Sequence, residues 1–114
     1  MEKIVEQALL FDFYGELLTK HQKQIYEDVV LNDLSLSEAA ENYGITRQGV
    51  HDLIKRCNRI LKGYEEKLQL VEKFLTTKKL VQEIYELSQE IEEKPEKKEI
   101  LKIQKLAKEI LEEI

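Results

Sequence analysis

The chain has 114 residues, of which 42% are hydrophobic and 36% are charged, and its formal net charge is −5. A length of this order predicts one domain, with room for an appended helical extension. Only four glycines and one proline are present, which favours long helices over turn-rich β structure and predicts an all-α fold. The single cysteine, Cys57, excludes an internal disulfide and a thiolate metal cluster and fits a reducing cytoplasm.

The first segment, MEKIVEQALLFDFYGELL, predicts a helix with a broad apolar stripe. The stripe is formed at three- and four-residue steps by Ile4, Ala8, Leu9, Phe11, Phe13 and Leu17. The segment is not a signal peptide, because acidic residues interrupt it and no basic start leads to a small-residue cleavage site. Apolar runs reach at most four residues, against the roughly 20 that span a bilayer. We therefore expect a cytoplasmic protein with no membrane contact.

Three helix starts follow, each marked by a hydroxyl residue. Thr19 with Gln22 has the spacing of a capping box, and the helix it opens should turn Ile25, Tyr26, Val29 and Val30 inward and end at Asn32 and Asp33. Ser35, with Glu38 three residues on, predicts the next start. That helix is short, because Gly44 suits a left-handed helix end. Thr46 should cap a further helix that begins at Arg47.

The second half predicts long amphipathic helices. The helix from Arg47 is expected to run to about Thr76–Thr77 unless Gly63 bends or ends it. Thr77 can cap another helix, and Pro95 suits a turn or the first turn of the last one. The predicted apolar positions are Leu80, Ile84, Leu87 and Ile91, followed by the heptad-like seam Ile100, Ile103, Ala107, Ile110 and Ile114.

Residues 35–61 match the packing demands of a helix-turn-helix. Such a motif needs a small residue where its helices approach, a turn residue tolerant of positive φ, and inward apolar residues about one turn apart. Counted from Leu36, the fitting residues stand at positions five, nine, ten, fifteen and eighteen, namely Ala40, Gly44, Ile45, Val50 and Leu53. The agreement of five positions with two capping signals predicts the motif, with a recognition helix from Arg47.

Residues 18–62, LTKHQKQIYEDVVLNDLSLSEAAENYGITRQGVHDLIKRCNRILK, resemble the promoter-contacting last domain of bacterial sigma factors. The likeness lies in Leu18-Thr19 with Gln22, in Leu34-Ser35-Leu36 with Glu38, Ala39 and Ala40, and in Gly44-Ile45-Thr46-Arg47 with Val50. The whole chain is similar to the YlxM/p13 family of small bacterial helix-turn-helix proteins. Members are typically encoded beside the signal recognition particle GTPase and its receptor. The resemblance implies a regulatory role linked to that pathway, and it brings no catalytic residues with it.

Charge is unevenly distributed along the chain. Residues 1–34 carry net −4, residues 35–62 net +2, residues 63–114 net −3, and the stretch 47–62 alone carries +4. If the second helix enters a major groove, its exposed N-terminal residues reach base edges. The predicted DNA-binding residues are Thr46, Arg47, Gln48, His51, Lys55 and Arg59. Asp52 stands among them and would repel phosphate, and solvated surface is the alternative reading of these cations.

Other side chains predict no chemistry. His51 and Cys57 are six residues apart on one helix and so face different directions, while His21 is remote in sequence. No Gly-rich phosphate loop, nucleophile–base pairing or cofactor motif is found. We therefore expect no enzyme activity, no metal site and no cofactor. The tyrosines lie on or beside apolar faces and are expected to pack in the core or an interface.

Two functions remain open on sequence grounds. The first is a sigma-region-4-like, DNA-binding regulatory protein, with residues 1–62 carrying the helix-turn-helix and residues 63–114 forming a helical extension for packing or dimerisation. A homodimer, through these helices or the N-terminal one, would cover the apolar stripes and present two recognition helices. The second is a protein- or RNA-interaction module of the signal recognition particle system, with the helix-turn-helix as a scaffold that does not bind DNA.

Overall fold

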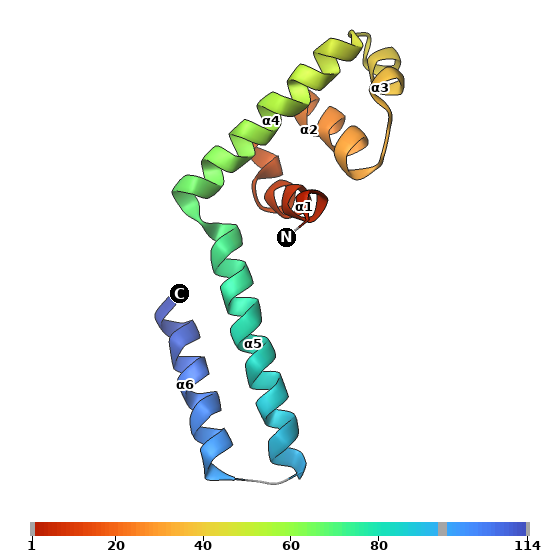
Figure 1. Ribbon diagram of the computed structural model, residues 1–114. Coiled ribbons are helices and arrows are strands. Elements are labelled where there is room, and N and C mark those ends of the chain that lie inside the picture. Colours follow the sequence, from red (N-terminus) through yellow and green to blue (C-terminus); the bar gives the residue numbers. More distant parts are fainter. Residues whose placement is uncertain (1, 94–95, 114) are drawn as a thin grey trace. The chain divides into compact units, whose positions relative to one another are not determined.

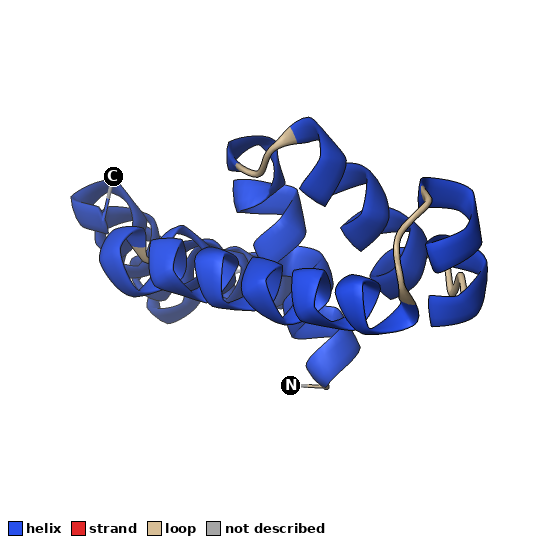
Figure 2. Ribbon diagram, turned by 90° about the horizontal axis from the view of Figure 1, so that it is seen from above, coloured by secondary structure: helices blue, strands red, loops and turns tan. Residues whose placement is uncertain are grey.

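The computed structural model describes residues 2–93 and 96–113, and within these ranges the protein is all-α, as predicted (Figures 1 and 2). Short loops join the helices, and no strand occurs in the described part of the chain. No helix in these ranges is both long and apolar enough to cross a membrane. The elements are α1 (Lys3–Tyr14), the 3₁₀ turn η1 (Gly15–Leu17), α2 (Lys20–Tyr26), the π-helical turn η2 (Glu27–Leu31), α3 (Leu36–Tyr43), α4 (Arg47–Leu68), α5 (Leu70–Glu93) and α6 (Lys97–Glu113).

The chain divides into two compact units, residues 1–71 and residues 72–114. In the first unit α1, α2 and α3 all pack against α4, which is therefore the central helix of that unit. The second unit is a hairpin of α5 and α6, which run antiparallel (Figure 1). The division is geometric; that residues 1–62 and 63–114 have separate roles stays a prediction.

The inward face of α1 differs from the predicted stripe. Leu10, Tyr14 and Leu18 are buried, one turn apart, whereas Phe13 and Leu17 are exposed. The predicted members Ala8, Leu9 and Phe11 are half-buried. The prediction was wrong for Ile4, Phe13 and Leu17, because nearly every side of α1 carries apolar residues and the stripe had no unique direction. The buried residues follow Leu10 at steps of four, and they lie on the side of α1 that packs against α4.

The caps that open α2, α3 and α4 form as predicted. Thr19 Oγ1 accepts from Gln22 N, and Gln22 Oε1 accepts from Thr19 N, which completes the capping box. Ser35 Oγ accepts from Glu38 N at 3.0 Å, and Thr46 caps α4 in the same way. The helix begun at Thr19 continues through η2 and ends at Asn32.

The helix-turn-helix is built by α3, the turn at Gly44 and α4. Gly44 has φ +67°, and the backbone N–H groups of Gly44 and Ile45 both donate to Ala40 O, so the end of α3 is closed by a left-handed residue as predicted. Its core is a cluster of Ile25, Ala39, Ala40 and Val50. Partly buried side chains pack around that cluster, namely Val29, Leu34, Leu36, Tyr43, Ile45, Leu53 and Ile54.

The predicted boundaries of the long helices were wrong. α4 runs through Gly63 without a break and ends at Leu68, where Gln69 takes a left-handed conformation with φ 54°. α5 then begins at Leu70 and passes through Thr76–Thr77 without interruption. The tertiary contact that fixes this end is made by Glu65, whose Oε1 accepts from Tyr14 OH at 2.5 Å and from Val71 N at 3.0 Å.

The α5–α6 hairpin brings the two predicted C-terminal stripes together only in part. Leu80, Ile84, Leu87 and Ile91 of α5 are half-buried, as are Ile103, Ala107 and Ile110 of α6. Ile100, predicted in the same seam, is instead exposed, because it lies on the flank of α6 beyond the side chains that meet α5. Pro95 and Ile114 lie outside the described residues.

Candidate nucleic-acid interface

The exposed face of α4 is a single polar stripe. Its members follow one another at steps of four and three residues, and all are exposed: Gln48, Asp52, Lys55, Arg59 and Lys62. The opposite face is buried at Val50, Cys57 and Leu61. Since 22 residues of α-helix extend about 33 Å, the stripe follows α4 well beyond the turns that a groove-reading helix uses for bases.

At the N-terminal end of α4 three predicted base-reading residues come together. Arg47, Gln48 and His51 line a shallow surface hollow with Leu36, the first residue of α3. All three polar side chains are exposed. The hollow therefore places a guanidinium, an amide and an imidazole side by side at the start of the second helix of the motif.

Thr46 has a structural task beside its predicted phosphate contact. Its Oγ1 accepts a hydrogen bond from Gly49 N at 2.9 Å and so caps α4. A Cβ at Gly49 would lie 3.1 Å from this hydroxyl oxygen, so a glycine here avoids a close contact with the capping side chain. The cap occupies the N–H of Gly49, and the start of α4 otherwise has the general affinity of a helix N-terminus for an anion.

Asp52 engages the residues that are predicted to read bases. Gln48 Nε2 donates to Asp52 Oδ1 at 2.9 Å, and His51 Nδ1 lies 3.7 Å from the same oxygen. Asp52 therefore does more than repel phosphate, since its carboxylate also holds the Gln48 amide along the helix. Because Gln48 Nε2 has a second hydrogen and Oε1 is an acceptor, this bond leaves the amide able to contact a further group while it fixes the orientation of the side chain.

Further along α4, a second hollow gathers most of the cations of the unit. Its lining residues are Lys3, Asp52, Lys55, Arg56, Asn58, Arg59 and Lys62. Of the predicted residues, Lys55 and Arg59 lie here, apart from the hollow of Arg47. Sequence reasoning missed Lys3, which comes from the start of α1 and reaches this surface only because α1 packs against α4. No local sequence pattern predicts the packing of α1 against α4.

A partly buried polar link connects α4 to α1 and α2 at Asn58, which also lines this second hollow. Asn58 Oδ1 accepts from Tyr26 OH at 2.6 Å and from Gln7 Nε2 at 3.3 Å, so one side chain of α4 holds both α2 and α1. Tyr26 is fully buried and stacks on Phe11, with ring centroids 5.5 Å apart. Burial, with a smaller effect of Cys57, raises the pKa of Tyr26 to about 12. The phenol therefore remains a hydrogen-bond donor at neutral pH.

A second polar link lies where α4 ends. Tyr14 is buried, its ring stacks on Tyr64 at 6.0 Å, and its hydroxyl donates to Glu65 while accepting from Leu70 N at 3.1 Å. Burial raises the pKa of Tyr14, and the hydrogen bond to Glu65 acts in the same direction. Spacing alone did not reveal this network, because its partners are more than fifty positions apart.

The remaining candidate residues do not form a reactive cluster. Cys57 is fully buried, and burial raises the pKa of its thiol to about 11, whereas His51 is half-exposed on another face of α4. Among residues 2–93 and 96–113, no three His, Cys, Asp or Glu side chains are arranged to hold a metal ion. Tyr14 and Tyr26 pack in the core as expected, while Tyr85 is exposed.

Comparison with known proteins finds similarity along nearly the whole chain. The family described as "Putative helix-turn-helix protein, YlxM / p13 like" matches residues 1–113. A UPF0122 protein of Acetivibrio thermocellus is 47% identical over 114 residues, which cover 100% of this chain and 97% of the relative. A UPF0122 protein of Shouchella clausii is 43% identical over 84 residues, covering 74% and 77%. One of Bacillus velezensis is 43% identical over 93 residues, covering 82% and 84%.

Proposed function

The chain belongs to the YlxM/p13-like family of helix-turn-helix proteins, and on that premise we propose that it is a non-enzymatic regulator that binds DNA through α4. One observation carries the proposal: Arg47, Gln48 and His51 are exposed together at the first turns of the second helix of the motif. This is the part of the motif that reads base edges in the major groove.

Each predicted residue receives a role from its chemistry. Arg47 makes a bidentate contact with guanine, and Gln48 makes one with adenine through Oε1 and an Nε2 hydrogen. Thr46 contacts a phosphate through its backbone N–H at the start of α4. Lys55 and Arg59 contact the phosphate backbone, with Lys3 and Lys62 of the same hollow beside them.

Binding by one chain is modest, because few cations serve it and the rest of the protein is acidic. Residues 1–34 and 63–114 carry net −4 and −3, so long-range attraction to DNA is weak. A homodimer therefore belongs to the proposal: it doubles the cationic surface and presents two α4 helices to two half-sites. A regulatory link to the signal recognition particle pathway rests on the family resemblance.

A second candidate function rests on the length of the cationic stripe. Lys55, Arg59 and Lys62 continue along α4 past the base-reading turns, and such a row of cations can follow any phosphate backbone. In this alternative the protein is an interaction module of the signal recognition particle, binding its RNA or a protein component, and the helix-turn-helix is a scaffold.

One titration separates the two functions. Binding of the full chain to mixed-sequence duplex DNA and to signal recognition particle RNA is measured by fluorescence anisotropy between about 25 and 200 mM salt. DNA affinity should fall with salt, and Arg47→Ala/Lys55→Ala should weaken it about 10- to 100-fold. Lys79→Ala/Lys98→Ala, which removes the same charge from exposed positions of α5 and α6, is the matched control.

The outcomes are distinct. Absence of DNA binding at the lowest salt, or equal loss in both double variants, contradicts the DNA-binding proposal. Binding to the RNA alone, lost in Arg47→Ala/Lys55→Ala, supports the alternative.

A further inference from the structure

α5 carries two apolar stripes on different sides of the helix. The first is half-buried and consists of Leu80, Ile84, Leu87 and Ile91. The second is exposed and consists of Val81 (52% exposed) and Tyr85 (58%). At 3.6 residues per turn, the centres of the two stripes lie about 110° apart around the helix axis. A single neighbouring helix covers one such stripe, so α5 offers apolar surface to a second neighbour.

α6 repeats this arrangement. Its half-buried side chains are Ile103, Leu106, Ala107 and Ile110, and Ile100 (44% exposed) and Leu111 (71%) stand about 80° away, in the same rotational sense as on α5. The two helices run antiparallel (Figure 1), and in an antiparallel pair the same rotational sense places both exposed stripes on one side. Val81, Tyr85, Ile100 and Leu111 thus form the apolar face of the hairpin.

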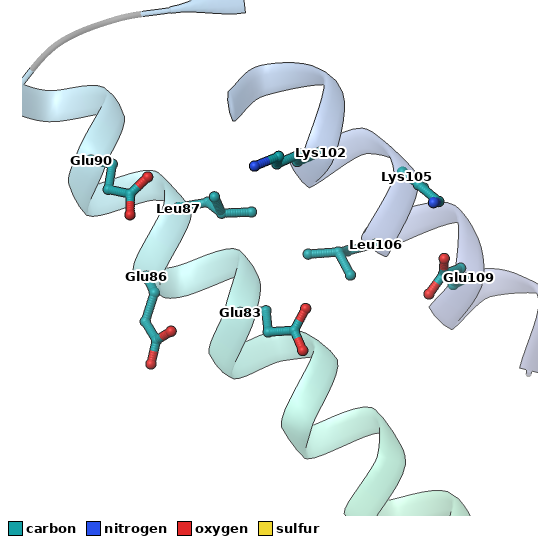
Figure 3. A pocket seen from close by; sticks show the side chains of 8 residues that line it. All are labelled: Glu83, Glu86, Leu87, Glu90, Lys102, Lys105, Leu106 and Glu109. Carbon is teal, nitrogen blue, oxygen red and sulfur yellow. The ribbon is translucent and has the colours of Figure 1, made fainter. Parts of the chain in front are cut away.

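The other side of the hairpin is charged. Figure 3 shows Leu87 and Leu106 pointing toward one another between the helices, within a hollow whose rim is ionic. Its rim is formed by Glu83, Glu86 and Glu90 of α5 and by Lys102, Lys105 and Glu109 of α6. The hairpin therefore presents a charged face for solvent and an apolar face opposite to it.

The hairpin has no interior of its own. Within the described part of the chain, every fully buried side chain lies at Val71 or before it, so no residue from 72 onward is fully removed from water by the α5–α6 contact. Two helices alone seldom bury enough apolar surface to be stable, whereas four helices enclose a core.

We propose that a second copy of this chain covers the apolar face, so that two hairpins form an antiparallel four-helix bundle. The spacing of the α5 stripe supports this packing, because Val81 and Tyr85 are four residues apart, as neighbouring inward positions of a coiled coil are. The interface specifies the homodimer that belongs to the proposed function, but it needs no nucleic acid, so its failure and a failure of DNA binding are distinguishable.

Charge identifies a second copy as the occupant. Lys78 precedes Tyr85 by seven residues and Glu92 follows it by seven, so all three lie on nearly the same line of α5, and both charged residues are exposed. A two-fold axis at Tyr85, with two α5 helices antiparallel, sets Lys78 of each copy against Glu92 of the other. The two Tyr85 rings then meet at the axis, and the stripe is complementary to itself.

The size of the face suits a dimer. From Lys78 to Glu92 the helix extends about 21 Å, and two helices side by side are about 20 Å wide. The projected area of roughly 400 Å² increases when the relief of the side chains is counted, toward the about 800 Å² that each partner of a standard interface buries.

Sedimentation of the full chain from about 1 to 200 µM tests the association. We expect a dimer of twice the 13.5 kDa chain mass, and Val81→Glu should raise its dissociation constant roughly 100-fold, because it buries two unpaired charges. Lys78→Glu should also weaken the dimer, and Lys78→Glu/Glu92→Lys should restore it. The restoring variant excludes misfolding as the cause of the loss. Glu86→Gln, on the charged face, should leave the dimer unchanged.

A cross-link tests the position of the axis. Since Cys57 is buried, an added surface cysteine is the reactive one. Tyr85→Cys should form an intermolecular disulfide under mild oxidation, and Glu86→Cys should not. A monomer at 200 µM overturns the proposal. A dimer that survives Val81→Glu and is not cross-linked at position 85 also overturns it, and places the interface elsewhere, for instance on α1.

Discussion

Asp52 stands at the centre of the exposed face of α4, where its carboxylate holds Gln48 and lies near His51. Asp52→Ala removes a negative charge that faces phosphate and frees the Gln48 amide, so DNA affinity should rise about 3- to 10-fold. Anisotropy titration at fixed salt measures the change. Glu90→Ala, an equal change of charge on α5, should alter affinity by less than twofold; an equal rise in both variants would show that net charge alone is responsible.

The hydroxyl of Tyr26 joins α2 to Asn58 of α4 in a fully buried position. Tyr26→Phe should lower the free energy of unfolding by about 1–2 kcal/mol, because Asn58 Oδ1 loses its shorter hydrogen bond. Urea denaturation followed by circular dichroism measures this. Tyr64→Phe keeps the ring that stacks on Tyr14 and should change stability by about 0.5 kcal/mol or less. Equal losses in the two variants would contradict the importance of the Asn58 link.

Two buried acids make stability depend on alkaline pH. Burial raises the pKa of Cys57 from 9.0 to about 11 and that of Tyr26 from 10.0 to about 12. The folded state holds both protons more tightly than the unfolded state does. The stabilisation is therefore complete below pH 9 and is lost as pH rises, from 9 to 11 for Cys57 and from 10 to 12 for Tyr26. Urea denaturation at pH 8, 10 and 11 should show a steady loss, and the loss should be shallower in Tyr26→Phe/Cys57→Ala. Identical pH slopes in the two proteins would refute this assignment.

At the scale of elements, Gly44 and Gly63 make a matched pair. Gly44 has φ +67° in the helix-turn-helix turn, whereas Gly63 lies inside α4 with open space where a Cβ would stand. Gly44→Ala should cost about 1–2 kcal/mol of stability from backbone strain, and Gly63→Ala should add about 0.5–1 kcal/mol from helix propensity. Thermal unfolding of both variants measures the difference. Changes of the same sign would contradict the two backbone assignments.

The helix-turn-helix could be predicted because its signals are local. Thr19, Ser35 and Thr46 each satisfy a backbone donor three residues away, and Gly44 meets a backbone requirement of its own turn. Each cap and its partner lie within one helical turn of sequence. The sequence alone therefore predicts where these helices begin and where α3 ends.

The other element boundaries depend on distant partners. Gln69 ends α4 in a left-handed conformation beside Glu65, which binds both Tyr14 and the start of α5. The inward face of α1 is likewise selected by α4. Neither Gly63 nor Thr77 competes with these contacts, which is why both failed as boundary signals. The candidate site shows the same division: Arg47, Gln48 and His51 follow from spacing on one helix, while Lys3 reaches the cationic hollow only through tertiary packing.

At the scale of the whole molecule, an acidic chain has its strongest concentration of net positive charge on one helix, α4. The stretch 47–62 carries net +4 within a protein of net −5, so the attraction for a nucleic acid is concentrated along α4. Our account therefore predicts a binding footprint confined to α4 and the start of α1, with affinity that decreases steeply with salt.

Amide chemical-shift mapping by NMR tests this footprint most directly. The full chain, labelled with ¹⁵N, is titrated with a mixed-sequence duplex DNA at about 50 mM salt. Our account predicts that the largest shift changes fall on residues 46–62 and at Lys3, and that they shrink at about 200 mM salt. Shift changes that are absent, or that centre on α5 and α6, would contradict the claim that α4 binds DNA.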